Sequence, residues 1–338
     1  DPEKDAIVPR YRGLPDLTPA QAGWIYAYGH NAPDCVSAAF LQSGISGFLK
    51  LEDTGADTLR ISKQRTAQTG EEKIIDHNLN IPITLTKKYN PSMKIFMKTF
   101  ETFLENKAGE KYFTQNTLWL VLGCLLTAAL TAGLCFLADE PHLALIMGFY
   151  LIFFVSFGKK IVATLSTGKF SFSAFFGLIF VSVHFCGMTL GAASEMPDAA
   201  HILPFYLLSC LALMVYSFLI IRPTYEGMQV IAHLDGIKMF LKAVEPTLPK
   251  EVDFNKMESL LPYAVLFGLE KEWEEKMKIV SAGTAYRPDW YGGHNFSFRS
   301  LNTFHSVVST SCTPPSRSGS GGGGHSGGGF GGGGGGGR

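Results

Sequence analysis

The sequence predicts a multi-pass α-helical membrane protein with four transmembrane helices. A folded polar arm precedes these helices along the chain, and a second arm follows them. Two observations support this prediction. Four apolar segments follow one another, at residues 117–137, 142–158, 171–193 and 202–221. The formal charges between them lie in the connections, which are acidic in the first and third and basic in the second. The positive-inside rule places such a basic connection in the cytoplasm, so we expect both ends of the chain there too.

Residues 1–92 predict a small winged-helix-like α+β domain that ends in a loop. Thr18 followed by Pro19 is typical of an N-cap and a first helical residue, so we expect a helix from Thr18 to Tyr28. A second helix is expected over 32–42. Residues 47–52 and 58–62 then alternate apolar and polar side chains around a Gly-containing turn, which predicts a hairpin.

The hairpin and the two helices together suggest a winged-helix shape, which often binds DNA. The second helix, however, carries Asp34 and no lysine or arginine. It therefore offers nothing to phosphates or to a guanine edge. The whole chain balances 29 basic against 29 acidic residues. We expect no nucleic-acid partner.

Residues 93–116 predict an amphipathic helix that leads to the membrane. Phe96, Phe100, Phe103 and Leu104 recur at helical spacing, and charged residues occupy the other positions. Two environments suit the apolar face, the membrane surface and the polar arm. The sequence does not decide between them.

The predicted membrane block offers few groups for chemistry. His184 is its single ionisable side chain well inside a span, which makes it a candidate functional residue; a neutral histidine bonded to a helix carbonyl or to Ser182 is the alternative. Oxygen and imidazole ligands could meet around a divalent ion at the acidic connections. Those spacings match no metal signature, so we expect no metal, and six residues stay as weak candidates: Asp139, Glu140, His142, Glu195, Asp198 and His201.

The C-terminal arm predicts a helical cytosolic domain over 222–291 and a disordered Ser/Gly-rich tail over 292–338. Glutamates and lysines interleave at helical spacing in 270–276, which is typical of a solvated face. Gly dominates the end of the chain, and such a segment buries too little surface to offset its ordering entropy.

Several short motifs, in order along the chain, resemble one family. They are Val8-Pro9-Arg10-Tyr11, Leu17-Thr18-Pro19-Ala20, Gly47-Phe48-Leu49-Lys50 and Leu261-Pro262-Tyr263-Ala264. The succession is similar to the C-terminal portion of DUF2207, a bacterial family of predicted membrane proteins of unknown function. The resemblance implies that members begin with a signal peptide, an extracytoplasmic β-rich domain and one further span, so we expect this sequence to be the C-terminal two-thirds of such a protein. The resemblance implies the bacterial inner membrane and carries over no catalytic residue.

These observations favour a non-enzymatic membrane scaffold or sensor whose cytosolic arms bind protein partners. Lipid is the other expected partner, and the oligomeric state is left open. We expect no enzyme, no cofactor and no catalytic or cofactor-binding residue. Two alternatives stay open: a transporter or channel component, and a metal-dependent membrane hydrolase that would need the two acidic loops to converge.

Overall fold

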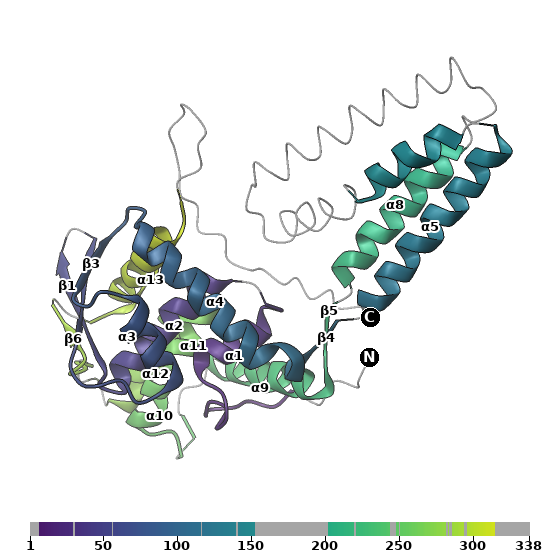
Figure 1. Ribbon diagram of the computed structural model, residues 1–338. Coiled ribbons are helices and arrows are strands. Elements are labelled where there is room, and N and C mark those ends of the chain that lie inside the picture. Colours follow the sequence, from purple (N-terminus) through teal and green to yellow (C-terminus); the bar gives the residue numbers. More distant parts are fainter. Residues whose placement is uncertain are drawn as a thin grey trace. The chain divides into compact units, whose positions relative to one another are not determined.

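The computed structural model describes residues 7–29, 31–55, 57–115, 117–139, 141–152, 202–219, 221–243, 248–249, 251–281, 283, 286–293 and 296–314 (Figure 1). The chain divides into two compact units. The first comprises residues 1–112 and 223–338, and we call it the split unit because both ends of the chain build it. The second comprises residues 113–222, and we call it the apolar unit.

The split unit begins with α1 (Pro19–Tyr26) and α2 (Ala32–Ile45). Thr18 caps α1 as its sequence predicted: its side chain accepts from the Gln21 N–H at 3.2 Å, and the Gln21 side chain accepts from the Thr18 N–H. This reciprocal capping box satisfies two otherwise unpaired donors. Helix α2 is buried along most of its length, and α1, α4, α11 and α13 all contact it.

A four-stranded sheet has the order β3-β2-β1-β6, formed by β3 (Ile83–Thr86), β2 (Thr58–Lys63), β1 (Leu49–Gly55) and β6 (Tyr291–Gly292). The predicted hairpin is present, with Leu51 opposite Ile61. The winged-helix prediction is nevertheless wrong, because the hairpin is no free wing. Strand β3 pairs with one edge, and β6, from the other end of the chain, pairs in parallel with the other. Both partners satisfy edge N–H and C=O groups that a wing leaves open.

Two further helices complete the N-terminal arm, α3 (Gly70–Asn78) and α4 (Pro91–Tyr112). Met93, Phe96, Phe100 and Leu104 are fully buried at the helical spacing noted in the sequence. Helix α4 contacts α1, α2, α9 and α13. The apolar face of this amphipathic helix therefore packs inside the split unit.

The C-terminal arm contributes α9 (Tyr225–Lys242), α10 (Phe254–Ser259), α11 (Leu261–Phe267), α12 (Glu270–Val280) and α13 (Phe298–Cys312). Helices α11 and α13 pack on α2, and α9 packs on α1 and α4, as Figure 1 shows. The predicted fold class, with one domain on each arm, is therefore wrong: apolar faces of both arms are buried in one core. The glycine-rich end, residues 315–338, lies outside the described residues.

Helix α13 lies in a region that was expected to be disordered. Leu301, Phe304, Val307 and Val308 are buried, at intervals that place them on one helical face. The helix begins at a capping box in which Ser297 is the N-cap. The Ser- and Thr-rich composition hid this apolar periodicity.

Helix α12 buries two of the charged residues that were expected in solvent. Glu270 is 6% exposed and Lys276 is 4% exposed. The Lys276 ammonium donates to the Ala243 carbonyl at 2.6 Å and lies over the Phe240 ring. Trp273, between them, donates from Nε1 to the Met257 carbonyl at 2.6 Å. The prediction that this face is solvated is wrong for these two residues, because α12 packs against α9, α10 and α13.

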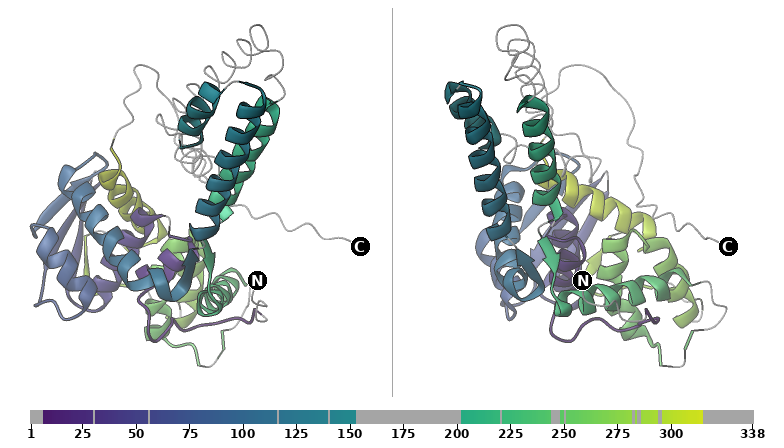
Figure 2. Two further views of the ribbon diagram at one scale, coloured as in Figure 1. Left: turned by 45° about the vertical axis from the view of Figure 1, so that its right-hand side comes forward. Right: turned by 90° about the vertical axis from the view of Figure 1, so that its right-hand side faces the viewer.

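The apolar unit begins and ends with the paired strands β4 (Phe113–Gln115) and β5 (Ile221–Pro223). Between them lie α5 (Thr117–Leu137), the helix Pro141–Ile152 and α8 (Ile202–Leu219). Helices α5 and α8 lie side by side (Figure 2). Leu120, Cys135, Met147, Tyr206 and Leu213 belong to their shared core.

The four-span prediction is a second error in the fold class. Within the described residues, one helix is long and apolar enough to cross a bilayer, Thr117–Leu137, with a mean hydropathy of 2.3. In the described part of the chain, Pro141–Ile152 and the apolar stretch Pro204–Leu213 of α8 are shorter than the roughly 20 residues that a crossing needs. The third predicted span, 171–193, lies outside the described residues. Residues 153–158 of the second predicted span lie outside them as well.

Candidate functional site

Residues 8–17 form an extended strap that is laid across α9. The Arg10 N–H donates to the Gly236 carbonyl at 3.0 Å, and His233 Nε2 lies 2.8 Å from the Arg12 carbonyl, to which it donates. Gly236 allows this close approach, since a Cβ there would lie 2.3 Å from the Val8 carbonyl oxygen. Two cavities of the split unit share Leu14, Pro15, Asp16 and Leu17 of the strap as a common wall.

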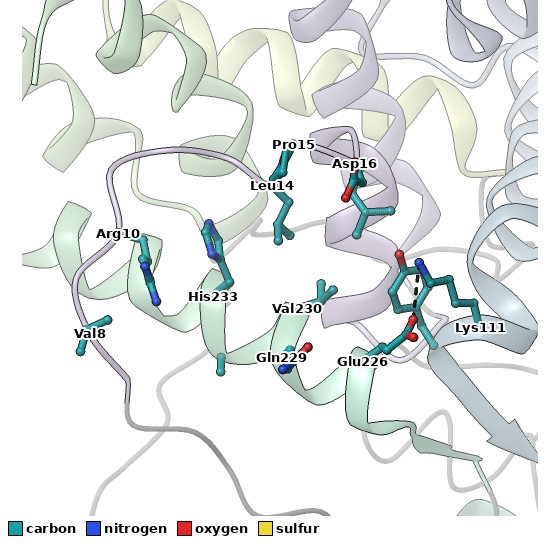
Figure 3. A pocket seen from close by; sticks show the side chains of 13 residues that line it. Val8, Arg10, Leu14, Pro15, Asp16, Lys111, Glu226, Gln229, Val230 and His233 are labelled. Carbon is teal, nitrogen blue, oxygen red and sulfur yellow. Dashed lines mark ion pairs between the residues drawn. The ribbon is translucent and has the colours of Figure 1, made fainter.

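The first cavity, of about 450 Å³, lies between the strap and α9 (Figure 3). Its charged groups have both signs: Arg10 and Asp16 come from the strap, Lys111 from α4, and Glu226 from α9. Lys111 and Glu226 pair at 3.4 Å, but both side chains are more than half exposed. An exposed pair of this kind contributes little. The mixed charges therefore select no class of ligand.

The second cavity, of about 430 Å³, has a more defined character, and we call it the acidic cavity. Its charged lining residues are all carboxylates: Asp16, Glu71 and Glu72. Four elements supply its walls, namely residues 13–19, the end of α2, the start of α3 and the α10–α11 region. The polar side chains among them are Thr18, Gln42, Ser43, Ser46, Thr69, Ser259 and Tyr263.

Glu72 holds one wall of the acidic cavity in place. Arg65 grips it with two bonds, from Nη1 to Oε2 at 2.9 Å and from Nη2 to Oε1 at 2.7 Å. The backbone N–H of Gln68 donates to the same carboxylate, and so does the hydroxyl of Ser46, the residue that follows α2. Burial by itself raises the pKa of Glu72, but these bonds, led by that from Arg65, lower it to about 2. Glu72 is thus an ionised structural group.

Glu71, its neighbour on α3, has the opposite environment. The side chain is 4% exposed, and its one hydrogen bond in the described part of the chain comes from the Thr18 hydroxyl to Oε1. Burial raises the pKa of Glu71 to about 7, an effect that the Thr18 bond partly offsets. Two adjacent carboxyl groups thus have pKa values on either side of the normal range. Such pairs are typical of sites that exchange a proton or bind a charge.

Three buried side chains leave polar atoms free to meet a ligand in the acidic cavity. Within the described residues, Glu71 Oε2 and the Ser43 hydroxyl have no protein partner, and the Tyr263 hydroxyl donates to no protein acceptor. Their residues are 4%, 3% and 2% exposed, and all three line this cavity. Glu71 Oε2 and the Ser43 hydroxyl are not fully enclosed, because Thr131 Oγ1 is the fully buried side-chain atom without a partner among the described residues. Polar atoms held in this way are normally satisfied by water or a ligand.

Sequence patterns alone did not predict the acidic cavity. Its local signal was Thr69-x-x-Glu72, a capping box at the start of α3, which accounts for Glu72 but not for Glu71. The burial of Glu71 depends on Thr18, Ser43 and Tyr263, which lie far from it along the chain. No local pattern could have revealed it.

The residues singled out from the sequence fall elsewhere. Asp139, in a left-handed conformation, and His142 are exposed in the apolar unit. Glu140, His184, Glu195, Asp198 and His201 lie outside the described residues. The described part of the chain contains no group of three or more His, Cys, Asp or Glu side chains that could hold a metal ion. The six weak metal candidates and His184 stay predictions.

Comparison with known proteins gives one match. A family described as "Predicted membrane protein (DUF2207) C-terminal domain" matches residues 8–277. This confirms the resemblance noted in the sequence. Neither a curated protein nor a solved structure matches the chain.

Proposed function

Because this chain belongs to the DUF2207 C-terminal-domain family of predicted membrane proteins, we propose that it is a membrane-anchored binding module, a non-enzymatic scaffold or sensor. The apolar unit is the anchor, and the split unit carries the binding surface. One observation carries the proposal: the apolar unit exposes its large apolar side chains, whereas the split unit closes a core of its own and keeps a polar cavity beside it.

The exposed apolar side chains support lipid contact. Leu125 and Leu126 on α5 are each 62% exposed, Leu137 is 86% exposed, and Leu145 on the next helix is 81% exposed. In water, contiguous apolar surface of this kind promotes association. In a bilayer this apolar surface contacts the hydrocarbon core, which is also apolar. The N–H and C=O groups of the helices are hydrogen-bonded within each helix, so they need no water there.

The split unit supports the placement of both arms on one side of the membrane. The Thr224 N–H donates to the Tyr112 carbonyl at 2.9 Å, so the chain leaves this unit and returns to it at adjacent points. Lys111, two residues before the apolar unit, and Arg222, its last residue, lie at these points. The positive-inside rule then favours the cytoplasmic face of the inner membrane for the split unit.

Protease access tests this placement. In inverted inner-membrane vesicles, protease added outside should digest the split unit, while in right-side-out vesicles the unit should survive. Digestion in right-side-out vesicles alone would refute the cytoplasmic placement. Complete extraction of the chain by high salt or carbonate would refute the anchor.

Site-specific photo-crosslinking tests the binding role. Asp16 is exposed at the rim of both cavities, so a photoreactive residue there should capture a discrete partner in intact membranes. The same residue at Glu105, exposed on α4 away from the cavities, is the control. Equal patterns of adducts at the two positions would contradict a binding surface at the strap.

A further inference from the structure

We propose that the acidic cavity binds a small amphipathic organic cation, a primary ammonium on a compact apolar body. This proposal rests on the proposed sensor function, because it names the class of ligand that the sensor would bind. The cavity lies wholly inside the split unit, however, so its occupancy can be measured separately from membrane placement.

The sign of the charge follows from the lining. Among the described residues that line the cavity, Asp16, Glu71 and Glu72 are the charged ones, and none is a lysine, arginine or histidine. Arg65 neutralises Glu72 from outside the cavity. An anionic ligand would meet carboxylates without a compensating cation, whereas a cation would pair with Glu71 in a site of low dielectric constant.

The hydrogen-bonding groups favour an ammonium over other cations. Glu71 Oε2 and the Ser43 hydroxyl supply two oxygen acceptors without a protein partner among the described residues, on α3 and α2. The Tyr263 hydroxyl on α11 supplies a third oxygen, which accepts from the Leu14 N–H and has a second lone pair. An ammonium has three N–H donors and no acceptor, which matches such a set. A divalent metal normally takes six or more oxygen ligands, several of them carboxylates, and the described residues contain no such group.

The strap and the first residue of α1 supply the apolar contact. Leu14, Pro15, Leu17 and Pro19 line the same cavity as the carboxyl and hydroxyl groups. A volume of about 430 Å³ falls within the range of small-molecule sites, roughly 300–1,000 Å³. A ligand with an apolar body and one charged end therefore uses both kinds of surface.

Protonation of Glu71 should control this binding. The titratable or charged groups around it are Asp16 on the strap, Glu72 with Arg65 behind it, Cys35 on α2 and Tyr263 on α11. Burial keeps the Cys35 thiol and the Tyr263 phenol neutral near pH 7, because it raises the pKa of both. Glu72 stays ionised throughout this range. Glu71 is then the group whose charge changes between pH 6 and pH 8, and a bound cation favours its ionised form.

The test uses the full chain in nanodiscs of zwitterionic lipid, with empty nanodiscs as the blank for partitioning. Isothermal titration calorimetry compares benzylammonium with benzyl alcohol, which has the same body without the charge. We expect saturable binding of benzylammonium alone, about tenfold weaker at pH 6 than at pH 8 if Glu71 must lose its proton. Calcium chloride, titrated separately, should give no saturable binding.

Two variants locate the binding site. Glu71→Gln keeps the shape of the side chain and should abolish both the preference for the cation and the pH dependence. Glu105→Gln, on an exposed position of α4, should bind as the wild type does. Near-ultraviolet circular dichroism verifies that both variants are folded.

The remaining outcomes each overturn the proposal. Equal binding of benzyl alcohol would make the cavity a neutral apolar site, and tight binding of calcium would make it a metal site. Absence of saturable binding, or retention of the cation preference in Glu71→Gln, would remove the ammonium site altogether. None of these results would alter the protease pattern that tests the membrane placement.

Discussion

Replacement of Glu71 by glutamine removes a buried acid whose ionisation opposes folding at high pH. The folded-state pKa is about 7, against an ordinary value of 4.5. Between these two values the folded chain holds a proton that the unfolded chain has released, so the free energy of unfolding falls as the pH rises. The loss is largely complete above pH 7. Glutamine stays neutral and keeps the hydrogen bond from Thr18 within reach.

The magnitude follows from the two pKa values. One unit is worth about 1.4 kcal/mol. With these values, the wild type should lose about 2.5 kcal/mol from this group between pH 5 and pH 8, and Glu71→Gln should lose none of it. Because other groups titrate in both proteins, the quantity to compare is the difference between wild type and variant at each pH.

Denaturant unfolding in detergent micelles measures that difference. Trp24, Trp273 and Trp290 are buried in the split unit, so their fluorescence reports its unfolding. We expect the variant to become more stable than the wild type by an increasing margin from pH 5 to pH 8. A difference that stays constant with pH would refute the reasoning, because Glu71 would then be ionised in both the folded and the unfolded chain. A difference of the opposite slope would refute it as well.

Four further substitutions test other contacts. Gly236→Ala should displace the strap, because its Cβ would lie 2.3 Å from the Val8 carbonyl oxygen. We expect the free energy of unfolding, measured by chemical denaturation, to fall by about 1–3 kcal/mol. The control Gly109→Ala, whose Cβ would meet nothing within 4 Å, should not destabilise the chain. Trp273→Phe should cost about 1–3 kcal/mol in the same assay, since it removes the buried indole bond to the Met257 carbonyl and leaves that carbonyl only the 3.2 Å bond from the Leu260 N–H. An unchanged midpoint would show that water replaces the indole. Leu125→Asp should reduce the share of the chain that floats with lipid vesicles, because a charged side chain in the bilayer costs about 3 kcal/mol. The control Leu125→Ala should float as the wild type does. Equal flotation of the aspartate variant and the wild type would mean that Leu125 does not face lipid. Arg65→Ala should raise the pKa of Glu72, because it removes two hydrogen bonds to the Glu72 carboxylate. Carbon-13 NMR of the Glu72 carboxyl group should then show its titration at a higher pH than in the wild type. An unshifted titration would mean that the bonds from Gln68 and Ser46 are enough to keep Glu72 ionised.

Local sequence patterns identified several elements correctly. Thr18-Pro19 begins α1 because a hydroxyl acceptor and a fixed φ are properties of those two residues alone. The spacing of Phe96, Phe100 and Leu104 identified the buried face of α4, since a helix places every third or fourth residue on one side. The β1–β2 hairpin followed from alternation around a glycine turn. The apolar character of residues 113–222 was equally evident, and so was the family.

Decisions that depend on contacts between distant segments were beyond such patterns. The sheet receives Tyr291 beside Leu51, and the split unit joins residues 7–112 to residues 223–314, because edges and apolar faces are satisfied by whichever segment reaches them. Composition suggested solvent for Glu270 and Lys276 and disorder for α13, while packing buries all three. The acidic cavity is the clearest case. Glu71 is an ordinary glutamate in the sequence, and only the approach of Thr18, Ser43 and Tyr263 removes it from water and sets its pKa. Chemistry local to a residue can be read along the chain, whereas solvation and charge are properties of the surroundings that folding assembles.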